Sequence, residues 1–301
     1  MRASPYAISV IIPAFNRRHD ITRAIASALA QTRQPDEIIV VDDASTDGTV
    51  DAIEALREPR IRILRHARNR GAAAARNTGI EAAKGEWIAL LDSDDEWDEH
   101  KLERQLASLA NAPADTLAGV TGYLIEDHRN GETRRFQPTP REVTLDRLLL
   151  GCALSIGSTL LARRDVFAEI GLIDSELPRL EDWEWLMRYL AKYRLDALPD
   201  ILTTVHKSGD PSFKQVSTAV ARIRARHREA WYRRSWVAGR KFDSTLLVEE
   251  AAACYFVGNF RGAATLSLRA ILAYPFRGGD FFAMLARRAL RLGSAKQRKA
   301  G

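Results

Sequence analysis

One strand-like segment constrains the fold of this chain more than any other. Residues 86–97 read Glu-Trp-Ile-Ala-Leu-Leu-Asp-Ser-Asp-Asp-Glu-Trp, an apolar run that ends abruptly in aspartates. Such a run is typical of a strand that is buried on both faces in the middle of a parallel sheet. The carboxyl ends of these strands face the ligand crevice of an open α/β sheet. The segment therefore predicts an α/β fold with a polar site at the end of this strand.

Asp92 and Asp94 are the first candidates for that polar site, because a single residue separates them. If the strand unwinds at its end, the two carboxylates can hold one hard cation and leave positions for water and substrate phosphates. The alternative is that they cap a helix that begins near residues 98–101. The rest of the chain has to decide between a metal site and a helix cap.

Strand-type and helix-type segments alternate over the first hundred residues. This alternation predicts a doubly wound, mostly parallel, Rossmann-like sheet flanked by helices. The first strand is expected to stop at Pro13, since proline cannot donate a hydrogen bond to a sheet ladder. The predicted strands are 8–12, 37–41, 60–64 and 87–91, and the predicted helices are 20–31, 49–57 and an alanine-rich helix ending near residue 84.

The second half of the chain predicts a less regular continuation and then a change of character. After about residue 212 the sequence is basic and helical, and residues 214–241 hold nine Lys or Arg against one Glu. We expect one domain over 1–211, with a first half (1–100) and a second half (101–211), and a basic α-helical region over 212–301. In the second half, the predicted strands are 119–125, 134–136 and 156–161, and the predicted helices are 164–171 and 182–193.

Composition narrows the class of protein. A chain of 301 residues with 46% hydrophobic and 28% charged residues is typical of a globular protein with one sizeable core. Cys152 and Cys254 lie far apart in apolar surroundings, which favours free thiols and the cytoplasm. Neither a signal peptide nor an apolar run long enough to span a membrane is evident. Basic residues near 287–291, beside apolar ones, would suit peripheral contact with anionic lipid on the inner face of a membrane, or a solvated helix.

Four further motifs, taken in chain order, carry a family resemblance. They are Val-Ile-Ile-Pro-Ala-Phe-Asn (10–16), Val-Val-Asp-Asp-Ala-Ser-Thr-Asp-Gly-Thr (40–49), Asn-Arg-Gly with Ala-Arg-Asn-Thr-Gly (69–79), and Leu-Asp-Ser-Asp-Asp (91–95). Together they resemble the family 2 inverting glycosyltransferases, which have the GT-A fold. The resemblance extends to about residue 205 through Glu-Asp-Trp-Glu-Trp (181–185) and Val-His-Lys (205–207). It implies transfer of a sugar from a nucleoside diphosphate donor to an acceptor hydroxyl with inversion. It also implies that residues 1–211 are the catalytic domain, with 1–100 as its nucleotide-sugar half and 101–211 as its acceptor half.

The resemblance also implies roles for residues of the donor site. Asp43 would accept the N–H of a uracil-type base, although a turn-forming Asp would look the same in sequence. Arg76 would lie near the pyrophosphate, although an Arg on a helix is often solvated. The implied donor and nucleotide residues are Pro13, Ala14, Phe15, Asn16, Asp43, Arg76 and Asp92.

The same resemblance implies a metal, a base and a donor. Asp94, Asp92 and His206 would hold Mn²⁺ or Mg²⁺, with a structural role as the alternative for His206. Asp182 would be the general base, with Glu181 as the alternative base and N-capping as the alternative role for Asp182. A uridine diphosphate sugar is the favoured donor, a thymidine nucleotide stays open, and the acceptor would be a saccharide or a lipid-linked sugar.

Other functions fit the sequence less well. A redox enzyme should carry Gly-x-Gly-x-x-Gly after its first strand, and Pro-Ala-Phe-Asn stands there instead. A polysaccharide synthase of this family would add membrane spans and a Gln-x-x-Arg-Trp motif. The sequence shows neither of them. The main alternative is a non-catalytic nucleotide-binding protein whose basic helices bind nucleic acid or a partner, but the basic region has no recognisable nucleic-acid motif. We therefore expect a metal-dependent hexosyltransferase of bacterial surface polysaccharide or glycolipid assembly, with no nucleic-acid partner.

Overall fold

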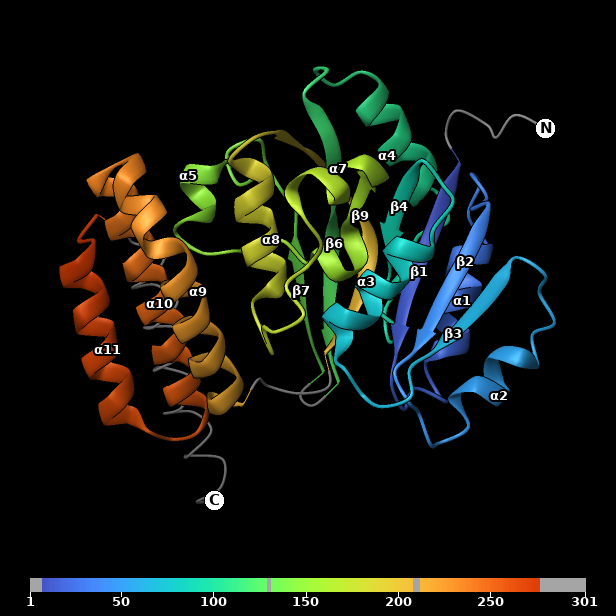
Figure 1. Cartoon of the computed structure of the whole chain (residues 1–301), viewed down its shortest axis with the longest axis horizontal. Helices are drawn as coiled ribbons and strands as arrows, with labels where there is room; N and C mark the ends of the chain where they lie inside the picture. The colour runs from blue at the N-terminus through green and yellow to red at the C-terminus, as the bar shows by residue number, and fades with distance from the viewer. Residues whose placement is uncertain (1–6, 129–130, 208–211, 277–301) are drawn as a thin grey trace. The chain divides into compact units, whose positions relative to one another are not determined.

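The computed structural model describes residues 7–128, 131–207 and 212–276. Its contacts divide the chain into two compact units, residues 1–211 and residues 212–301. The first unit is built on a sheet with helices on both faces, and the described part of the second is helical (Figure 1).

The first four strands of the sheet are parallel and adjacent in the order β3-β2-β1-β4. Chain order therefore reverses between β1 and β4, and open α/β sheets bind ligands at such a switch point, beyond the carboxyl ends of the strands. The elements of this half are β1 (Ile8–Ala14), α1 (Ile21–Leu29), β2 (Glu37–Asp42), α2 (Thr49–Glu54), β3 (Ile61–Arg65), α3 (Ala72–Ala82) and β4 (Trp87–Leu90).

The rest of the first unit extends the same sheet with mixed strand directions. Among the described residues the strand order continues β4-β8-β6-β9-β5, and β7 pairs with β6. β8 is antiparallel to β4 and β6, whereas β6 and β9 are parallel. The elements are β5 (Glu96–Trp97), α4 (Lys101–Ala110), β6 (Thr116–Asp127), β7 (Glu132–Phe136), α5 (Leu145–Leu148), α6 (Ile156–Thr159), β8 (Leu161–Arg163), α7 (Arg164–Ile170), α8 (Glu181–Leu190) and β9 (Arg194–Lys207).

These elements confirm the predicted Rossmann-like α/β sheet flanked by helices, parallel in the nucleotide half and mixed beyond it. The prediction of a strand over 156–161 is wrong. Residues 156–159 form the short helix α6, and the strand β8 begins at Leu161. This turn of helix brings Gly157 and Ser158 next to Asp92, whose backbone N–H donates to Ser158 Oγ.

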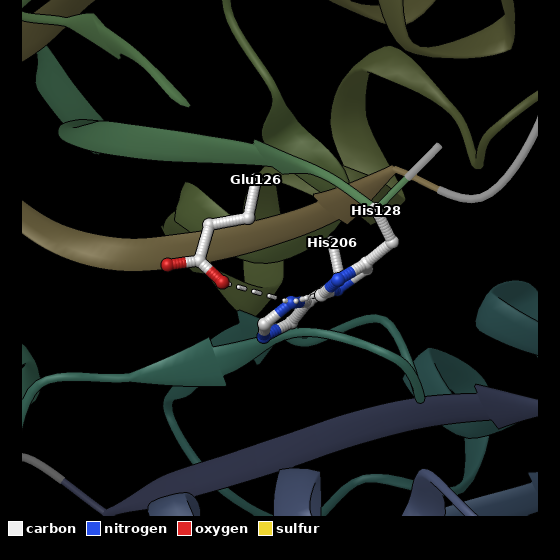
Figure 2. Close-up of side chains that lie close together, drawn as sticks. All are labelled: Glu126, His128 and His206. Carbon is white, nitrogen blue, oxygen red and sulfur yellow. Dashed lines mark hydrogen bonds and ion pairs between the residues drawn. The ribbon is translucent and has the colours of Figure 1, made fainter. Parts of the chain in front are cut away.

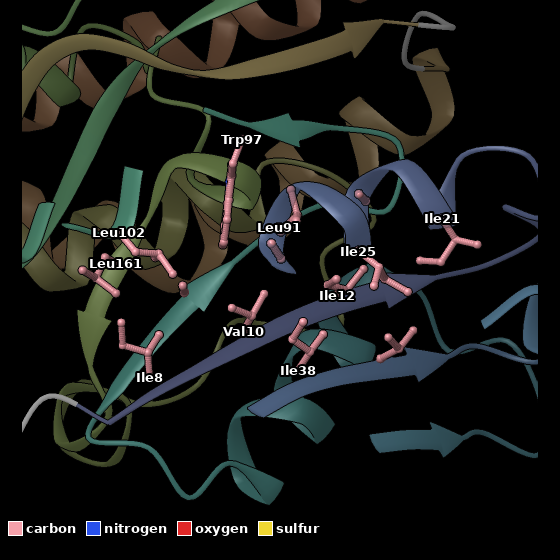
Figure 3. Packing of buried hydrophobic residues seen from close by; sticks show 14 of the residues in the cluster. Ile8, Val10, Ile12, Ile21, Ile25, Ile38, Leu91, Trp97, Leu102 and Leu161 are labelled. Carbon is pink, nitrogen blue, oxygen red and sulfur yellow. The ribbon is translucent and has the colours of Figure 1, made fainter. Parts of the chain in front are cut away.

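The two faces of β1 are buried under different helices. Ile8, Val10 and Ile12 alternate along the strand and pack in one cluster with Ile21 and Ile25 of α1 (Figure 3). Each of these five side chains is fully buried, and burying one isoleucine contributes about 1.5–3 kcal/mol.

The opposite face of β1 carries Ile11, which lies under α3. A Cβ atom added at Gly79 of α3 would lie 2.4 Å from Ile11 Cγ2, so the helix packs on the sheet at the closest distance that glycine allows. This packing fixes the height of α3 above the carboxyl end of β1.

The expectation that Pro13 ends the first strand is also wrong. β1 continues to Ala14, and Pro13 pairs in register with Val41 of β2. β4 pairs with β1 only from Ile8 to Ile11. Pro13 therefore has a strand on one side only, and such an edge position tolerates the missing amide.

The second unit contains the helices α9 (Phe213–Arg234), α10 (Trp236–Phe256) and α11 (Phe260–Ala273), so the appended helical region is confirmed. Ile223 and Phe242 are fully buried. A capping box formed by Ser212 and Gln215 starts α9. In the described ranges no helix has the length and apolarity needed to cross a membrane. The expected basic amphipathic segment around 287–291 lies outside the described residues.

Candidate functional site

A pocket of about 460 Å³ opens at the switch point between β1 and β4. Its walls come from the ends of β1, β2 and β4, from α3, and from the start of α8. The predicted residues that line it are Pro13, Ala14, Phe15, Asp43, Arg76, Asp92, Asp94 and Glu181. Asn16, Asp182 and His206 are not among the described residues that line it.

Phe15 and Asn16 have different roles in the loop after β1. Phe15 is 45% exposed at the pocket wall, so its ring offers a face for stacking with a base. Asn16 has a positive φ of 52°. Its backbone N–H donates to Ser45 Oγ (2.9 Å) and its Oδ1 accepts from the backbone N–H of Thr46 (2.9 Å). Asn16 thus ties this loop to the loop after β2 and positions Phe15.

Asp43 is almost fully buried and organises the turn that begins α3. Its carboxylate accepts the backbone N–H groups of Arg70 (2.8 Å) and Gly71 (2.7 Å). His66 Nδ1 lies 2.7 Å from Asp43 Oδ1, and His66 Nε2 lies 2.9 Å from Thr78 Oγ1. Asp43 therefore stabilises the turn before α3 at the pocket wall, and its role toward a nucleobase stays a prediction.

Arg76 is buried, so the alternative of a solvated helix face does not hold. Its guanidinium lies 2.5 Å from Asp92 Oδ1 and 3.2 Å from Glu181 Oε1. Burial by itself lowers the pKa of Arg76, but the charges of Asp92 and Glu181 outweigh it and raise the pKa above its ordinary value. Arg76 is therefore a permanent positive charge between Asp92, which follows β4, and Glu181 at the start of α8.

Gly157 makes room for this ion pair. A Cβ atom at this position would lie 2.4 Å from Asp92 Oδ2 and 3.0 Å from Arg76 Nη2. The sequence around Gly157 gave no reason to single it out, because the pair it accommodates comes from residues far away in the chain.

Asp94 faces Arg17, whose Nη2 lies 3.0 Å from Asp94 Oδ2. Burial raises the pKa of Asp94, Arg17 opposes the rise, and Asp92 adds to it. The alternative that these aspartates cap the following helix is wrong, because α4 begins at Lys101 and its N-cap residue is His100. A cation beside Asp94 would relieve the repulsion from Asp92 that helps to raise the pKa of Asp94.

Asp95 is a site residue that sequence reasoning missed. It is buried, and it accepts hydrogen bonds from Ser158 Oγ (2.5 Å) and from the backbone N–H of His206 (2.9 Å). Burial, followed by the charge of Asp92, raises its pKa well above the ordinary value. Asp95 therefore anchors the acidic loop to α6 and to the end of β9.

Comparison with known proteins identifies the family of the chain. A family model described as Glycosyl transferase family 2 matches residues 9–171, which is more than half of the chain. The chain belongs to glycosyl transferase family 2. This confirms the predicted family.

The chain is similar to the Escherichia coli UDP-Glc:alpha-D-GlcNAc-diphosphoundecaprenol beta-1,3-glucosyltransferase WfgD. The two are 35% identical over 158 residues, which cover 52% of this chain and 61% of WfgD. The chain thus matches about three fifths of that relative's length.

Two solved structures show the same fold at lower identity. S. aureus TarS 1-349 in complex with UDP has a TM-score of 0.58 and 20% identity, over 87% of this chain and 90% of that one. The mannosyltransferase PcManGT from Pyrobaculum calidifontis, in complex with GDP-Man and Mn²⁺, has a TM-score of 0.56 and 20% identity, over 96% of this chain and 81% of that one. Both confirm the predicted GT-A architecture.

Asp182 lies in the first turn of α8 but does not occupy the N-cap position. That position is Leu180, which has a left-handed φ of 62°. Asp182 Oδ1 accepts the backbone N–H of Trp183 at 2.7 Å. Burial, followed by the charge of Glu181, raises the pKa of Asp182 to about 6. A carboxylate with this pKa is suited to accepting a proton near neutral pH.

His206 lies among residues other than the two aspartates with which it was predicted to bind metal. Its ring nitrogens face Glu96, Glu126 and His128. Among the described residues, Glu126, His128 and His206 form a group of three potential ligands whose atoms all lie within 4.8 Å of one another (Figure 2). Asp92 and Asp94 are not part of this group. A shared cation for Asp92, Asp94 and His206 therefore stays a prediction.

Proposed function

We propose that this glycosyltransferase moves a hexose from a uridine diphosphate sugar to an acceptor hydroxyl with inversion at the anomeric carbon. The observation that carries the proposal is one pocket that brings together the exposed ring of Phe15 and two carboxylates, Asp94 and Asp92. Each carboxylate is paired with an arginine, Asp94 with Arg17 and Asp92 with Arg76. The presence of UDP in the similar TarS structure supports a uridine donor, and GDP-Man in PcManGT makes guanosine the competing base.

We extend the proposal to the acceptor. The relative WfgD is named for a sugar linked to diphosphoundecaprenol, which supports a lipid-linked saccharide and a role in bacterial surface polysaccharide or glycolipid assembly. The enzyme would then work at the cytoplasmic face of a membrane. The basic residues 287–291, which lie outside the described part, would attract anionic headgroups there.

The donor site offers charges that match a departing diphosphate. As the bond from the anomeric carbon to the diphosphate oxygen breaks, negative charge accumulates on the leaving group. Arg17 and Arg76 lie at the pocket wall, where fixed positive charge stabilises that leaving group without reorganisation.

Asp92 and Asp94 fit a divalent cation, Mn²⁺ or Mg²⁺. Both carboxylates line the pocket, and the mutual repulsion that helps to raise the pKa of Asp94 is what a hard cation relieves. A bound cation would supply further neutralisation of the diphosphate. Asp94 Oδ2 also pairs with Arg17, and Asp92 Oδ1 pairs with Arg76.

Asp182 is the proposed general base. The acceptor oxygen forms a bond to the anomeric carbon from the face opposite the diphosphate, and its proton passes to the Asp182 carboxylate. Asp182 lies beside the pocket rather than in its wall, and its charge acts on Tyr123 of β6 in the acceptor half. Glu181, which pairs with Arg76, is placed toward the donor.

The Asp94→Asn variant tests the donor site. Calorimetric titration of UDP into the wild-type enzyme should show affinity that rises on addition of Mn²⁺. In Asp94→Asn this dependence should be lost, with affinity at least about 10-fold lower in Mn²⁺, because a neutral amide is a weaker cation ligand. Asp51→Asn removes an exposed carboxylate on α2 and serves as the matched control. Equal Mn²⁺ dependence in all three proteins would contradict the assignment.

A further inference from the structure

Three potential metal ligands meet at the ends of β6 and β9, and the donor pocket does not include them. Glu126 of β6 pairs in register with His206 of β9. His128 lies in the turn directly after β6, and its imidazole ring stacks on that of His206 with ring centroids 5.0 Å apart. Figure 2 shows the three side chains converging from these two segments.

The spacing of the ligand atoms matches a small coordination sphere. His128 Nε2 lies 2.8 Å from His206 Nδ1, and Glu126 Oε2 lies 3.6 Å from the same nitrogen. Bonds of about 2.0–2.2 Å to a tetrahedral ion place neighbouring ligand atoms about 3.3–3.6 Å apart. The two imidazole rings are stacked with an interplanar angle of 9°. Only small side-chain shifts separate this arrangement from metal-ligand distances.

An independent contact fixes the orientation of the central ligand. His206 Nε2 lies 3.2 Å from Glu96 Oε1, on the side of the ring away from Glu126 and His128. A histidine that binds metal commonly donates its other ring N–H to a carboxylate, which sets the tautomer and raises the basicity of the binding nitrogen. The His206 side chain is 8% exposed, and His128 is exposed, so an ion could enter from the His128 side.

We propose that Glu126, His128 and His206 bind a transition-metal ion of the zinc class. Two imidazoles and one carboxylate suit Zn²⁺, whereas the all-carboxylate pair Asp92 and Asp94 suits Mg²⁺ or Mn²⁺. Three protein ligands leave a fourth position open to water or another ligand. The ion joins the ends of β6 and β9.

The proposed zinc site is connected to the acidic loop that carries Asp94 and Asp95. The backbone N–H of His206 donates to Asp95 Oδ1 at 2.9 Å, and Asp95 follows Asp94 directly. An ion that holds His206 therefore supports the acidic loop through the backbone of β9. This is a positioning effect, since no ligand of the zinc site lines the donor pocket among the described residues.

Zinc binding by the full chain tests the proposal. We would titrate the protein against a chromophoric Zn²⁺ indicator and measure zinc content by mass spectrometry after dialysis. The wild-type protein should bind about one equivalent with affinity sufficient to compete with the indicator. His128→Gln should lower the affinity by about 100-fold or more, because loss of an outer partner alone already costs about 10–100-fold. Glu96→Ala removes only that outer partner and should fall in this smaller range.

Two controls separate this site from others. His100→Gln removes an exposed histidine that also lies near two carboxylates, Glu99 (3.5 Å) and Glu103 (3.6 Å), and it should leave zinc binding unchanged. Asp94→Asn should also leave zinc binding unchanged. Equal affinity of wild type and His128→Gln would overturn the proposal, as would loss of zinc in Asp94→Asn, which would assign His206 to the donor cation. Because none of these measurements uses sugar transfer, failure of the proposed enzymatic activity would not be confused with failure of the zinc site.

Discussion

Asp182 is placed where folding opposes its negative charge. Burial and the neighbouring Glu181 raise its pKa to about 6, while Arg179 and Arg76 partly offset them. A half-buried carboxylate with this pKa is a better proton acceptor than a solvated one and is ionised at neutral pH. The same environment that prepares it for catalysis should therefore be visible in both rate and stability.

We predict that Asp182→Asn lowers turnover by about 10²–10⁴-fold with little change in donor affinity, because a sugar hydroxyl needs a base and the amide cannot accept its proton. Wild-type turnover should fall as the pH drops through about 6, where Asp182 becomes protonated. Glu181→Gln is the matched comparison. Measured turnover and UDP affinity together decide: near-normal turnover in Asp182→Asn would exclude it as the base. Normal UDP binding without turnover in the wild type would favour the non-catalytic alternative.

We also predict that Asp182→Asn stabilises the protein at high pH. The pKa of Asp182 is higher in the folded state than the ordinary value of 3.8, so the folded state binds more protons between these values. Stability therefore falls as the pH rises from about 4 to about 6, and the loss persists above that range. Removing the carboxyl removes this loss. Thermal unfolding should show a higher Tm for the variant at about pH 8 than for wild type, and a difference that shrinks toward about pH 4; a constant difference would contradict the origin in ionisation.

The residues that sequence reasoning found and missed differ in where their partners lie. Asp43, Asp92 and Asp94 could be predicted as pocket residues because each follows a strand, and strand ends converge at one edge. His66 and Gly157 could not, since their importance comes only from distant partners: Asp43 for the first and the Arg76–Asp92 pair for the second. No periodicity or local motif encodes such a contact.

At the scale of elements, the first hundred residues were predictable because short strand segments rich in apolar residues alternate regularly with helical segments. The errors arose where tertiary context decides. Pro13 stays inside β1 because β4 has already ended beside it. Residues 156–159 turn into a helix because the chain has to deliver Ser158 to Asp92 and Asp95. Pairing partners of this kind cannot be read from one segment.

The closeness of α3 to β1 gives a prediction at this scale. In an unrestrained helix, replacing glycine by alanine stabilises by about 1 kcal/mol. At Gly79 the added methyl would meet Ile11 Cγ2 at 2.4 Å, so we expect Gly79→Ala to destabilise the protein by about 1–3 kcal/mol instead. Urea unfolding measures the change.

The matched control for this prediction removes the opposing methyl groups. In an Ile11→Ala background the Cγ2 and Cδ1 atoms that crowd position 79 are gone. Gly79→Ala should then be neutral or stabilising relative to Ile11→Ala alone. If Gly79→Ala costs the same in both backgrounds, the loss does not come from the contact between α3 and β1.

At the scale of the whole molecule, the two units have separate apolar interiors. In the second unit, Leu247 and Val248 of α10 pack with Ala270 of α11, and the rings of Trp231 and Phe242 lie 6.4 Å apart. All of the residues that line the donor pocket belong to residues 13–181 of the first unit. A change of composition near residue 212 was visible in the sequence, but the way in which helices pack was not.

This separation predicts that a fragment of residues 1–211 folds and binds UDP with nearly the affinity of the full chain. The fragment keeps the entire described sheet, including β9, and the pocket residues Phe15, Asp43, Arg76 and Asp94. We expect the two Kd values to agree within about threefold, which corresponds to less than 1 kcal/mol. A shorter fragment that ends at residue 180 loses Glu181, α8 and β9, and therefore loses both a partner of Arg76 and the strand between β6 and β5; it should not bind. Calorimetry on both fragments, with circular dichroism to confirm folding, makes the comparison. A folded 1–211 fragment that binds UDP more than about 10-fold more weakly, a loss above 1.4 kcal/mol, would show that the helical unit takes part in holding the donor.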